Sequence, residues 1–147
     1  MKDFILPKYN FKTRLVSGKK QIFDPVRKKY VYLTKEEWVR QNIIQFLIKE
    51  KFYPLSLIRV EFNLKFNTLS KRADIVCFDN NGSVMLLVEC KSPEIQLNQN
   101  VFDQIAIYNL SFKSKFLLVT NGLNYFCCEM NYSLKKYSFL SEIPSFA

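Results

Sequence analysis

The sequence predicts an α/β fold built around one mixed β-sheet. Three observations lead to this prediction: a helical segment at 35–51, three strand segments between residues 57 and 91, and a second helical segment at 101–110 followed by an apolar strand at 116–120. Helices on either side of a run of strands can cover both faces of the sheet. The chain has 147 residues, typical of one domain, and 48% of them are hydrophobic, which is enough to build a core.

The N-terminal residues 1–33 predict a small β extension of that domain. Ser17-Gly18 is expected to turn the chain between strands at 13–16 and 21–23, and residues 30–33 predict a third short strand. Thr34 is a suitable N-cap for the first helix, because acidic residues follow it in the first helical turn. We therefore divide the single domain into an N-terminal β extension (1–33), a core (34–130) and a C-terminal tail (131–147).

The middle of the chain predicts a hairpin that brings acidic residues together. Residues 57–66 alternate as a half-buried strand, and two almost wholly apolar strands follow at 72–79 and 84–91. If Asn81-Gly82 forms a two-residue turn, Asp74 lies directly opposite Glu89 on the same face. Lys91 is two residues beyond Glu89 and points to that side. A four-residue loop from Asn80 to Ser83 keeps the same register.

This predicted cluster is suited to a divalent cation. Cross-strand carboxylates lie about 4.5–5.5 Å apart, so they repel each other unless a cation lies between them or one is protonated. Mg²⁺ or Mn²⁺ with oxygen ligands would satisfy both acids. The alternative from the residues alone is a structural ion pair at a strand end, and this spacing by itself does not exclude it.

Composition restricts the chemistry that the chain can perform. There is no histidine, and Cys77, Cys90, Cys127 and Cys128 form no C-x-x-C pair, which argues against zinc and against imidazole catalysis. The net charge of +9 favours a polyanionic partner, and without an amphipathic basic helix we favour nucleic acid over a membrane surface. No secretory signal or membrane span is recognisable, so a cytoplasmic location is expected.

Four motifs resemble the signature of PD-(D/E)xK nucleases. Residues 73–76 and 87–93 resemble the two central strands of that signature, although Ala73 replaces the usual proline. The first helix starts with an E-x-x-R pattern at residues 37–40, and the second helix contains a Q-x-x-x-Y pattern at 104–108. In this order, the motifs are most similar to the N-terminal nuclease domain of type I restriction enzyme R subunits. The resemblance implies a restriction-endonuclease-like α/β/α core with a central mixed sheet.

The resemblance also implies roles for individual residues. Asp74, Glu89 and the backbone carbonyl of Cys90 would bind Mg²⁺ or Mn²⁺, and Glu37, or Glu36 in its place, would reach the metal through water. Lys91 would orient the attacking water and stabilise negative charge on the phosphate. Supporting or DNA-binding roles are expected for Gln104, Tyr108, Arg40, Lys71 and Arg72. The chain contains no P-loop motif, so no use of ATP is expected.

The sequence therefore predicts a metal-dependent deoxyribonuclease that hydrolyses phosphodiester bonds. Two alternatives remain open at this point: a nucleic-acid-binding module with an inactive nuclease site, and a structural or adaptor protein whose charged cluster is a buried ion pair. The expected partner is DNA, and a second copy of the chain or another protein that supplies specificity is also left open.

Overall fold

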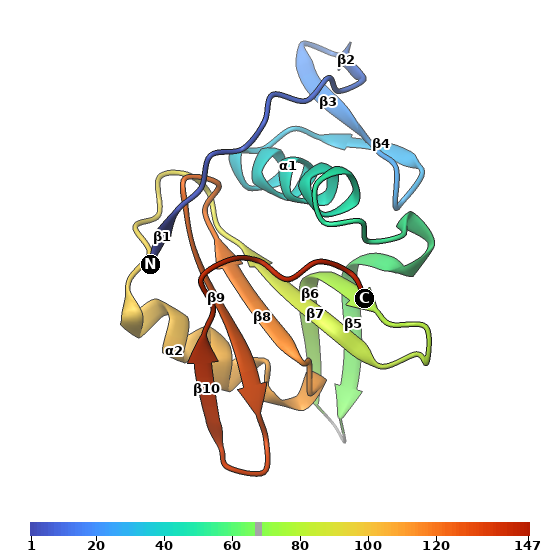
Figure 1. Ribbon diagram of the computed structural model, residues 1–147. Helices are drawn as coiled ribbons and strands as arrows, with labels where there is room; N and C mark the ends of the chain where they lie inside the picture. Colours follow the sequence, from blue (N-terminus) through green and yellow to red (C-terminus); the bar gives the residue numbers. More distant parts are fainter. Residues whose placement is uncertain (67–68) are drawn as a thin grey trace.

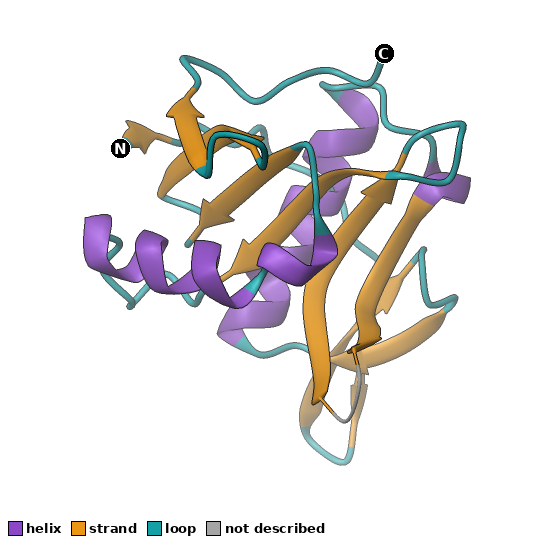
Figure 2. Ribbon diagram, turned by 90° about the horizontal axis from the view of Figure 1, so that it is seen from below, coloured by secondary structure: helices purple, strands orange, loops and turns teal. Residues whose placement is uncertain are grey.

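The fold is a sheet between two helices, with a second, smaller sheet at its N-terminal side (Figures 1 and 2). The computed structural model describes residues 1–66 and 69–147, and side chains outside 64–70. The large sheet has seven strands in the order β1-β9-β8-β7-β6-β5, with β10 also paired to β9. Its strands are β1 (Lys2–Asp3), β5 (Ile58–Phe66), β6 (Leu69–Phe78), β7 (Val84–Cys90), β8 (Phe116–Thr120), β9 (Asn124–Asn131) and β10 (Lys136–Phe139).

The large sheet is mixed, as the sequence predicts. The β7–β8 pair is parallel, and the other pairs are antiparallel. Helix α2 (Gln99–Tyr108) and the short 3-10 helix η2 (Leu110–Phe112) connect β7 to β8, as a parallel crossover requires. The short 3-10 helix η1 (Leu55–Leu57) leads into β5. Strand β10 lies in the C-terminal tail, for which the sequence predicts no strand.

Each face of the large sheet packs against one helix (Figure 2). Helix α1 (Lys35–Lys49) buries Val39, Ile43, Ile44 and Leu47 against one face. Helix α2 buries Phe102 and Ala106 against the other. Gly122, just after β8, has φ +85°, and a Cβ there would lie 3.3 Å from a Val39 methyl group. A glycine at this position therefore lets α1 approach the end of the sheet closely.

The smaller sheet contains β2 (Thr13–Val16), β3 (Lys19–Asp24) and β4 (Lys29–Tyr32), all antiparallel. Val16 pairs with Lys19, which confirms the predicted turn at Ser17-Gly18. Figure 1 shows this sheet on the side of α1 that faces away from the large sheet. Within residues 1–66 and 69–147, neither α1 nor α2 combines the length and apolarity that crossing a bilayer requires.

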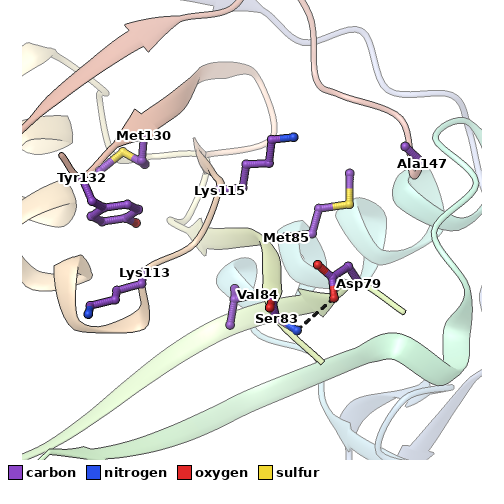
Figure 3. Close-up of a pocket in the computed structure, with 9 residues that line it drawn as sticks. All are labelled: Asp79, Ser83, Val84, Met85, Lys113, Lys115, Met130, Tyr132 and Ala147. Carbon is purple, nitrogen blue, oxygen red and sulfur yellow. Dashed lines mark hydrogen bonds between the residues drawn. The ribbon is translucent and has the colours of Figure 1, made fainter. Parts of the chain in front are cut away.

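The β6–β7 hairpin keeps the predicted register near its open end, but through a different turn. Asp79 N–H donates to the Ser83 carbonyl, and its carboxylate accepts from Ser83 N–H at 2.9 Å (Figure 3). The loop is therefore neither of the two predicted loops. The register then shifts between Cys77 and Phe78, because β7 has one extra residue there. This bulge offsets the different loop, and Ile75 pairs with Val88 as predicted.

Candidate active site

The predicted acidic pair lies where β6 and β7 run side by side toward the end of β7. Asp74 and Glu89 are each one residue beyond the paired Ile75 and Val88. The Cys90 N–H donates to Asp74 Oδ2 at 2.7 Å, which fixes Asp74 against β7. Because β7 and β8 are parallel, both strands end at this edge, where Cys90 pairs with Thr120. Carboxyl ends of neighbouring strands are common positions for functional groups in α/β folds.

One oxygen of the Glu89 carboxyl lacks a compensating partner. This oxygen, Oε1, is buried and has no hydrogen-bond partner among the described residues. Burial, and then the nearby Asp74 carboxylate, raise the pKa of Glu89 to about 9, while Lys91 acts in the opposite direction. A buried oxygen of this kind is costly unless a cation or a proton satisfies it. The site therefore favours an added positive charge between the two acids.

Arg40 from α1 already supplies one positive charge to Asp74. Its Nη2 lies 3.3 Å from Asp74 Oδ1, and its Nη1 lies 2.9 Å from Glu37 Oε1. Burial disfavours the charged form of Arg40, but Glu37 and Asp74 outweigh this effect and raise its pKa. Arg40 is therefore a permanent cation that links the first helix to strand β6.

The two candidate acids of α1 point to different surroundings. Glu37 is buried, with Oε1 accepting from Arg27 and Arg40 and Oε2 accepting from Gln41. Glu36 is half-exposed, and burial followed by the Asp74 charge raises its pKa, while Arg40 and Lys91 lower it. The charges of Asp74 and Lys91 therefore act on Glu36. Both carboxylate oxygens of Glu37, in contrast, accept hydrogen bonds from other side chains of the protein. The expected metal-reaching role of Glu37, or of Glu36 in its place, stays a prediction.

Glu61 is a part of this network that sequence reasoning missed. It lies 3.6 Å from Arg40 and 3.5 Å from Arg27, and its φ is +52°, in the left-handed region. Regular strands place residues two apart on one face. Here Val60 and Ile75 pack toward α1, whereas Phe62 and Ala73 pack toward α2. The strand pair therefore twists sharply at Glu61 and Asp74, and such local strain is common at functional sites.

Neither Glu61 nor Arg27 is recognisable as a network residue from the sequence. Glu61 falls between Val60 and Phe62 in an alternating strand, where a solvent-facing acid is the ordinary expectation. Arg27 lies in the turn between β3 and β4 and contacts Asp24, Glu37 and Glu61. The feature that identifies Glu61 is the bend in β5, and this bend is visible in the three-dimensional structure but not in the sequence.

The remaining predicted residues lie near the end of α2. The Lys71 ammonium donates to the Tyr108 carbonyl at 2.8 Å and lies 5.1 Å from the centre of its ring. Lys71 is three residues from Asp74 on β6, so this contact ties the end of α2 to the site strand. Gln104, Tyr108 and Arg72 are exposed. In the described part of the chain, no contact joins Gln104 or Tyr108 directly to Asp74, Glu89 or Lys91.

The donor set fits a hard divalent cation. Among the described residues, no three His, Cys, Asp or Glu side chains converge in an arrangement that could hold a metal ion by themselves. Mg²⁺ commonly binds one or two carboxylates and keeps several waters, so the Asp74–Glu89 pair and a backbone carbonyl meet its needs. The buried, unpartnered Glu89 oxygen is the feature that a cation would satisfy.

A surface hollow at the other end of β6 and β7 has a different character. It is lined by residues that include Asp79, Met85, Lys115 and Tyr132 (Figure 3). The Asp79 carboxylate accepts from the backbone of Asn81 and Ser83, so it serves the turn rather than a ligand. We therefore place the candidate active site at Asp74, Glu89 and Lys91.

The sequence matches the family described as type I restriction enzyme R protein N terminus (HSDR_N) over residues 35–144. The chain belongs to this family, since the matched segment covers most of its length, and it contains Asp74, Glu89 and Lys91. No curated protein matches the sequence.

A solved structure supports the fold. It is a fragment of a protein described as an HsdR subunit of a type I restriction enzyme from Vibrio vulnificus YJ016. The two chains are 20% identical, with a TM-score of 0.52, and the similarity covers 77% of this chain and 24% of that chain. This protein thus spans about a quarter of the length of that relative, and its fold is the nuclease-like α/β fold that the sequence predicts.

Proposed function

We propose that this chain is a metal-dependent deoxyribonuclease domain that hydrolyses phosphodiester bonds. The observation that carries the proposal is the Asp74–Glu89 pair, in which a buried carboxyl oxygen has no partner among the described residues. Asp74, Glu89 and the Cys90 carbonyl would hold Mg²⁺ or Mn²⁺. A bound ion of this kind supplies positive charge to the reacting phosphate and lowers the pKa of water.

The other side chains would have complementary tasks. Lys91 comes directly after β7, and its charge opposes the rise in the pKa of both Glu89 and Glu36. An ammonium group there can orient water and stabilise the negative charge that develops on the phosphate. Arg40 holds Asp74 in place. Glu36, rather than Glu37, would bind a water of the metal shell.

Family membership supports a role for this domain with DNA in restriction. The relative of known structure is described as a subunit of a type I restriction enzyme, and we propose that this chain likewise acts on DNA. We expect cleavage without ATP, because the proposed site uses carboxylates, lysine and a divalent ion alone. Other protein subunits could supply sequence specificity.

One observation favours the rival in which the cluster is only structural. Arg40 already neutralises Asp74 and Glu37, so part of the network is a complete buried ion pair. A purely structural cluster would neither bind Mg²⁺ or Mn²⁺ nor need Lys91.

The deciding experiment incubates linear, nicked and circular DNA with the protein in Mg²⁺, Mn²⁺ or EDTA. The proposal expects cleavage by the natural sequence and by the distant control Lys113→Ala, no cleavage in EDTA, and none by Lys91→Ala. Failure to cleave any DNA, together with no effect of either metal on thermal unfolding, would leave the structural rival standing.

A further inference from the structure

The positive charge of the chain is concentrated at its N-terminal end. Residues 1–34 contain nine basic and two acidic side chains, a net charge of +7, so residues 35–147 contribute only +2 to the total of +9. The family match begins at residue 35, so this basic segment lies outside it. The concentration of charge is therefore a property of the N-terminal segment.

The smaller sheet presents much of this charge on one open face. Strand pairing places Arg14, Lys19, Tyr30 and Tyr32 on the face opposite Ile22, which is buried. The Arg14 guanidinium lies 4.0 Å from the centre of the Tyr30 ring, and the Lys19 ammonium lies 5.7 Å from the Tyr32 ring. Lys12 lies 5.9 Å from the Phe23 ring. Each cation is therefore held by an aromatic ring rather than by a carboxylate.

Cations held in this way are suited to bind phosphates. Because no acid neutralises them in these contacts, their charge remains available to an anionic ligand. Because rings restrict the side chains, less conformational entropy is lost when a ligand binds. Arginine and lysine beside aromatic rings on a sheet are also typical of surfaces that bind nucleic-acid strands.

The smaller sheet is linked to the candidate active site through ion pairs that run from Arg27 to Arg40. Arg27, in the turn between β3 and β4, contacts Glu37 and Glu61 at 2.8 and 3.5 Å. Its other partner, Asp24, is completely buried at the end of β3. The exposed Lys28 and Lys29 follow Arg27 in the chain. A polyanion bound to the small sheet would therefore be held in a fixed position relative to the site.

The candidate active site itself cannot attract a polyanion strongly. Around Arg27, Arg40 and Lys91 lie six acidic residues: Asp24, Glu36, Glu37, Glu61, Asp74 and Glu89. Even with one carboxyl protonated, acids outnumber bases in this cluster. A negatively charged substrate therefore needs a second, basic surface to hold it there.

We propose that the open face of the smaller sheet, with Lys12, Arg14 and Lys19 at its centre, binds the DNA phosphate backbone and holds the substrate at the active site. This inference deepens the proposed nuclease function and rests on it. It assigns DNA binding to a region other than the α2 end, where Gln104 and Tyr108 lie.

The test compares two variants that lose the same charge. One is Lys12→Gln/Arg14→Gln/Lys19→Gln. The matched control is Lys113→Gln/Lys135→Gln/Lys136→Gln, which removes three exposed lysines near β9 and β10, at the opposite end of the molecule (Figure 1). Binding to labelled duplex and single-stranded DNA is measured in EDTA over a range of salt concentrations, so that cleavage plays no part. Polyglutamate is the competitor.

We expect the N-terminal variant to bind DNA roughly tenfold or more weakly, and its salt slope to fall by about 1 for each lost phosphate contact. The control should stay within about threefold of the natural sequence, and polyglutamate should compete poorly. Equal weakening of both variants, natural-level binding by the N-terminal variant, or effective competition by polyglutamate would each overturn the proposal. The last result would indicate an acidic protein partner.

Two measurements keep the result independent of folding and of catalysis. Circular dichroism and thermal unfolding check both variants, and Lys20→Gln/Lys29→Gln provides a second control, since strand pairing places these exposed lysines on the face that carries Ile22. That pair should bind DNA within about threefold of the natural sequence, and a loss as large as that of the N-terminal variant would contradict the assignment to the open face. If DNA is cleaved but binding does not depend on the sheet, this inference fails and the nuclease proposal stands. If DNA binding depends on the sheet but neither metal supports cleavage, the nuclease proposal fails and the DNA-binding surface stands.

Discussion

The candidate active site and the N-terminal sheet use charged residues in opposite ways. In the site, acids outnumber bases, and the central charges of Arg40 and Glu37 are buried and paired with each other. In the small sheet, bases dominate, and Arg14 and Lys19 are exposed and rest on tyrosine rings. Arg27 joins the two regions, because it lies in the β3–β4 turn but binds Glu37.

This difference predicts which charges contribute to the stability of the fold. Removing one member of a buried pair leaves an uncompensated charge, whereas removing an exposed cation changes stability little. The site should therefore respond strongly to substitutions and to metal. The small sheet should respond mainly in its affinity for anions. Four predictions test this contrast, from the largest expected effect to the smallest.

The largest effect is expected for Lys91→Ala. We expect cleavage to fall by about 10²–10³ or more, the size of the loss when one transition-state-stabilising group is removed. DNA affinity in EDTA should change little, because the basic sheet is intact. Single-turnover cleavage assays with Mg²⁺ measure this, with Lys113→Ala as the control. Undiminished cleavage by Lys91→Ala would show that Lys91 has no catalytic role.

Arg40→Ala and Arg14→Ala compare one arginine from each region. Loss of Arg40 should destabilise the fold by about 3–5 kcal/mol, because Glu37 and Asp74 lose their buried partner. Loss of Arg14 should cost about 1 kcal/mol or less, the value of an exposed cation–ring contact. Urea unfolding measures both. Similar losses for the two variants would contradict the contrast between the regions.

The third prediction concerns metal binding without substrate. Mg²⁺ or Mn²⁺ should raise the melting temperature, with a gain of about 2.7 kcal/mol at a concentration 100 times the dissociation constant. Asp74→Asn should lose most of this response, because one proposed ligand is gone. Lys12→Gln should keep it. Thermal melts across millimolar concentrations, repeated with DNA present, would reject the site if neither metal changed the melting of the natural sequence.

The fourth prediction concerns the stability of the fold in EDTA as a function of pH, and the partly buried Glu89. Its pKa is about 9 in the fold, against 4.5 as the ordinary value, so the folded state favours the protonated carboxyl. The Glu89 carboxyl does not reduce the free energy of unfolding below about pH 4.5. The reduction grows as the pH rises toward 9, because the folded state resists losing the proton. Glu89→Gln carries no such charge, and its amide can donate to Asp74.

Glu89→Gln should therefore be more stable than the natural sequence at pH 8, by at least about 1.4 kcal/mol, the equivalent of one pKa unit. The difference should shrink toward pH 5. Urea unfolding at several pH values gives the comparison, and Glu94→Gln, at an exposed position, is the control. A difference that grows as the pH falls would contradict the assigned cause.

Much of the fold follows from the sequence by local rules. Apolar periodicity located α1, α2 and the central strands, because burial on one or both faces imposes a regular spacing. Thr34 caps α1 as expected, since its hydroxyl accepts from the Glu37 N–H. The register of the hairpin at Ile75 and Val88 also followed, although the loop and the bulge in β7 were not foreseen. Strand β10 was missed because it has only four residues, of which only Tyr137 is partly buried, so the segment shows little periodic pattern.

Only the tertiary structure decided how the charges are shared. Glu36 and Glu37 are adjacent in sequence, and their side chains diverge by about 100° around the helix. The docking of α1 therefore decided that Glu37 is buried against Arg27 and Arg40, while Glu36 stays exposed. The bend at Glu61 likewise depends on the sheet twisting between two separate cores. The sequence alone determined the kinds of charge and the strands that bear them. Their pairing depends on contacts between residues far apart in the chain, which no local pattern encodes.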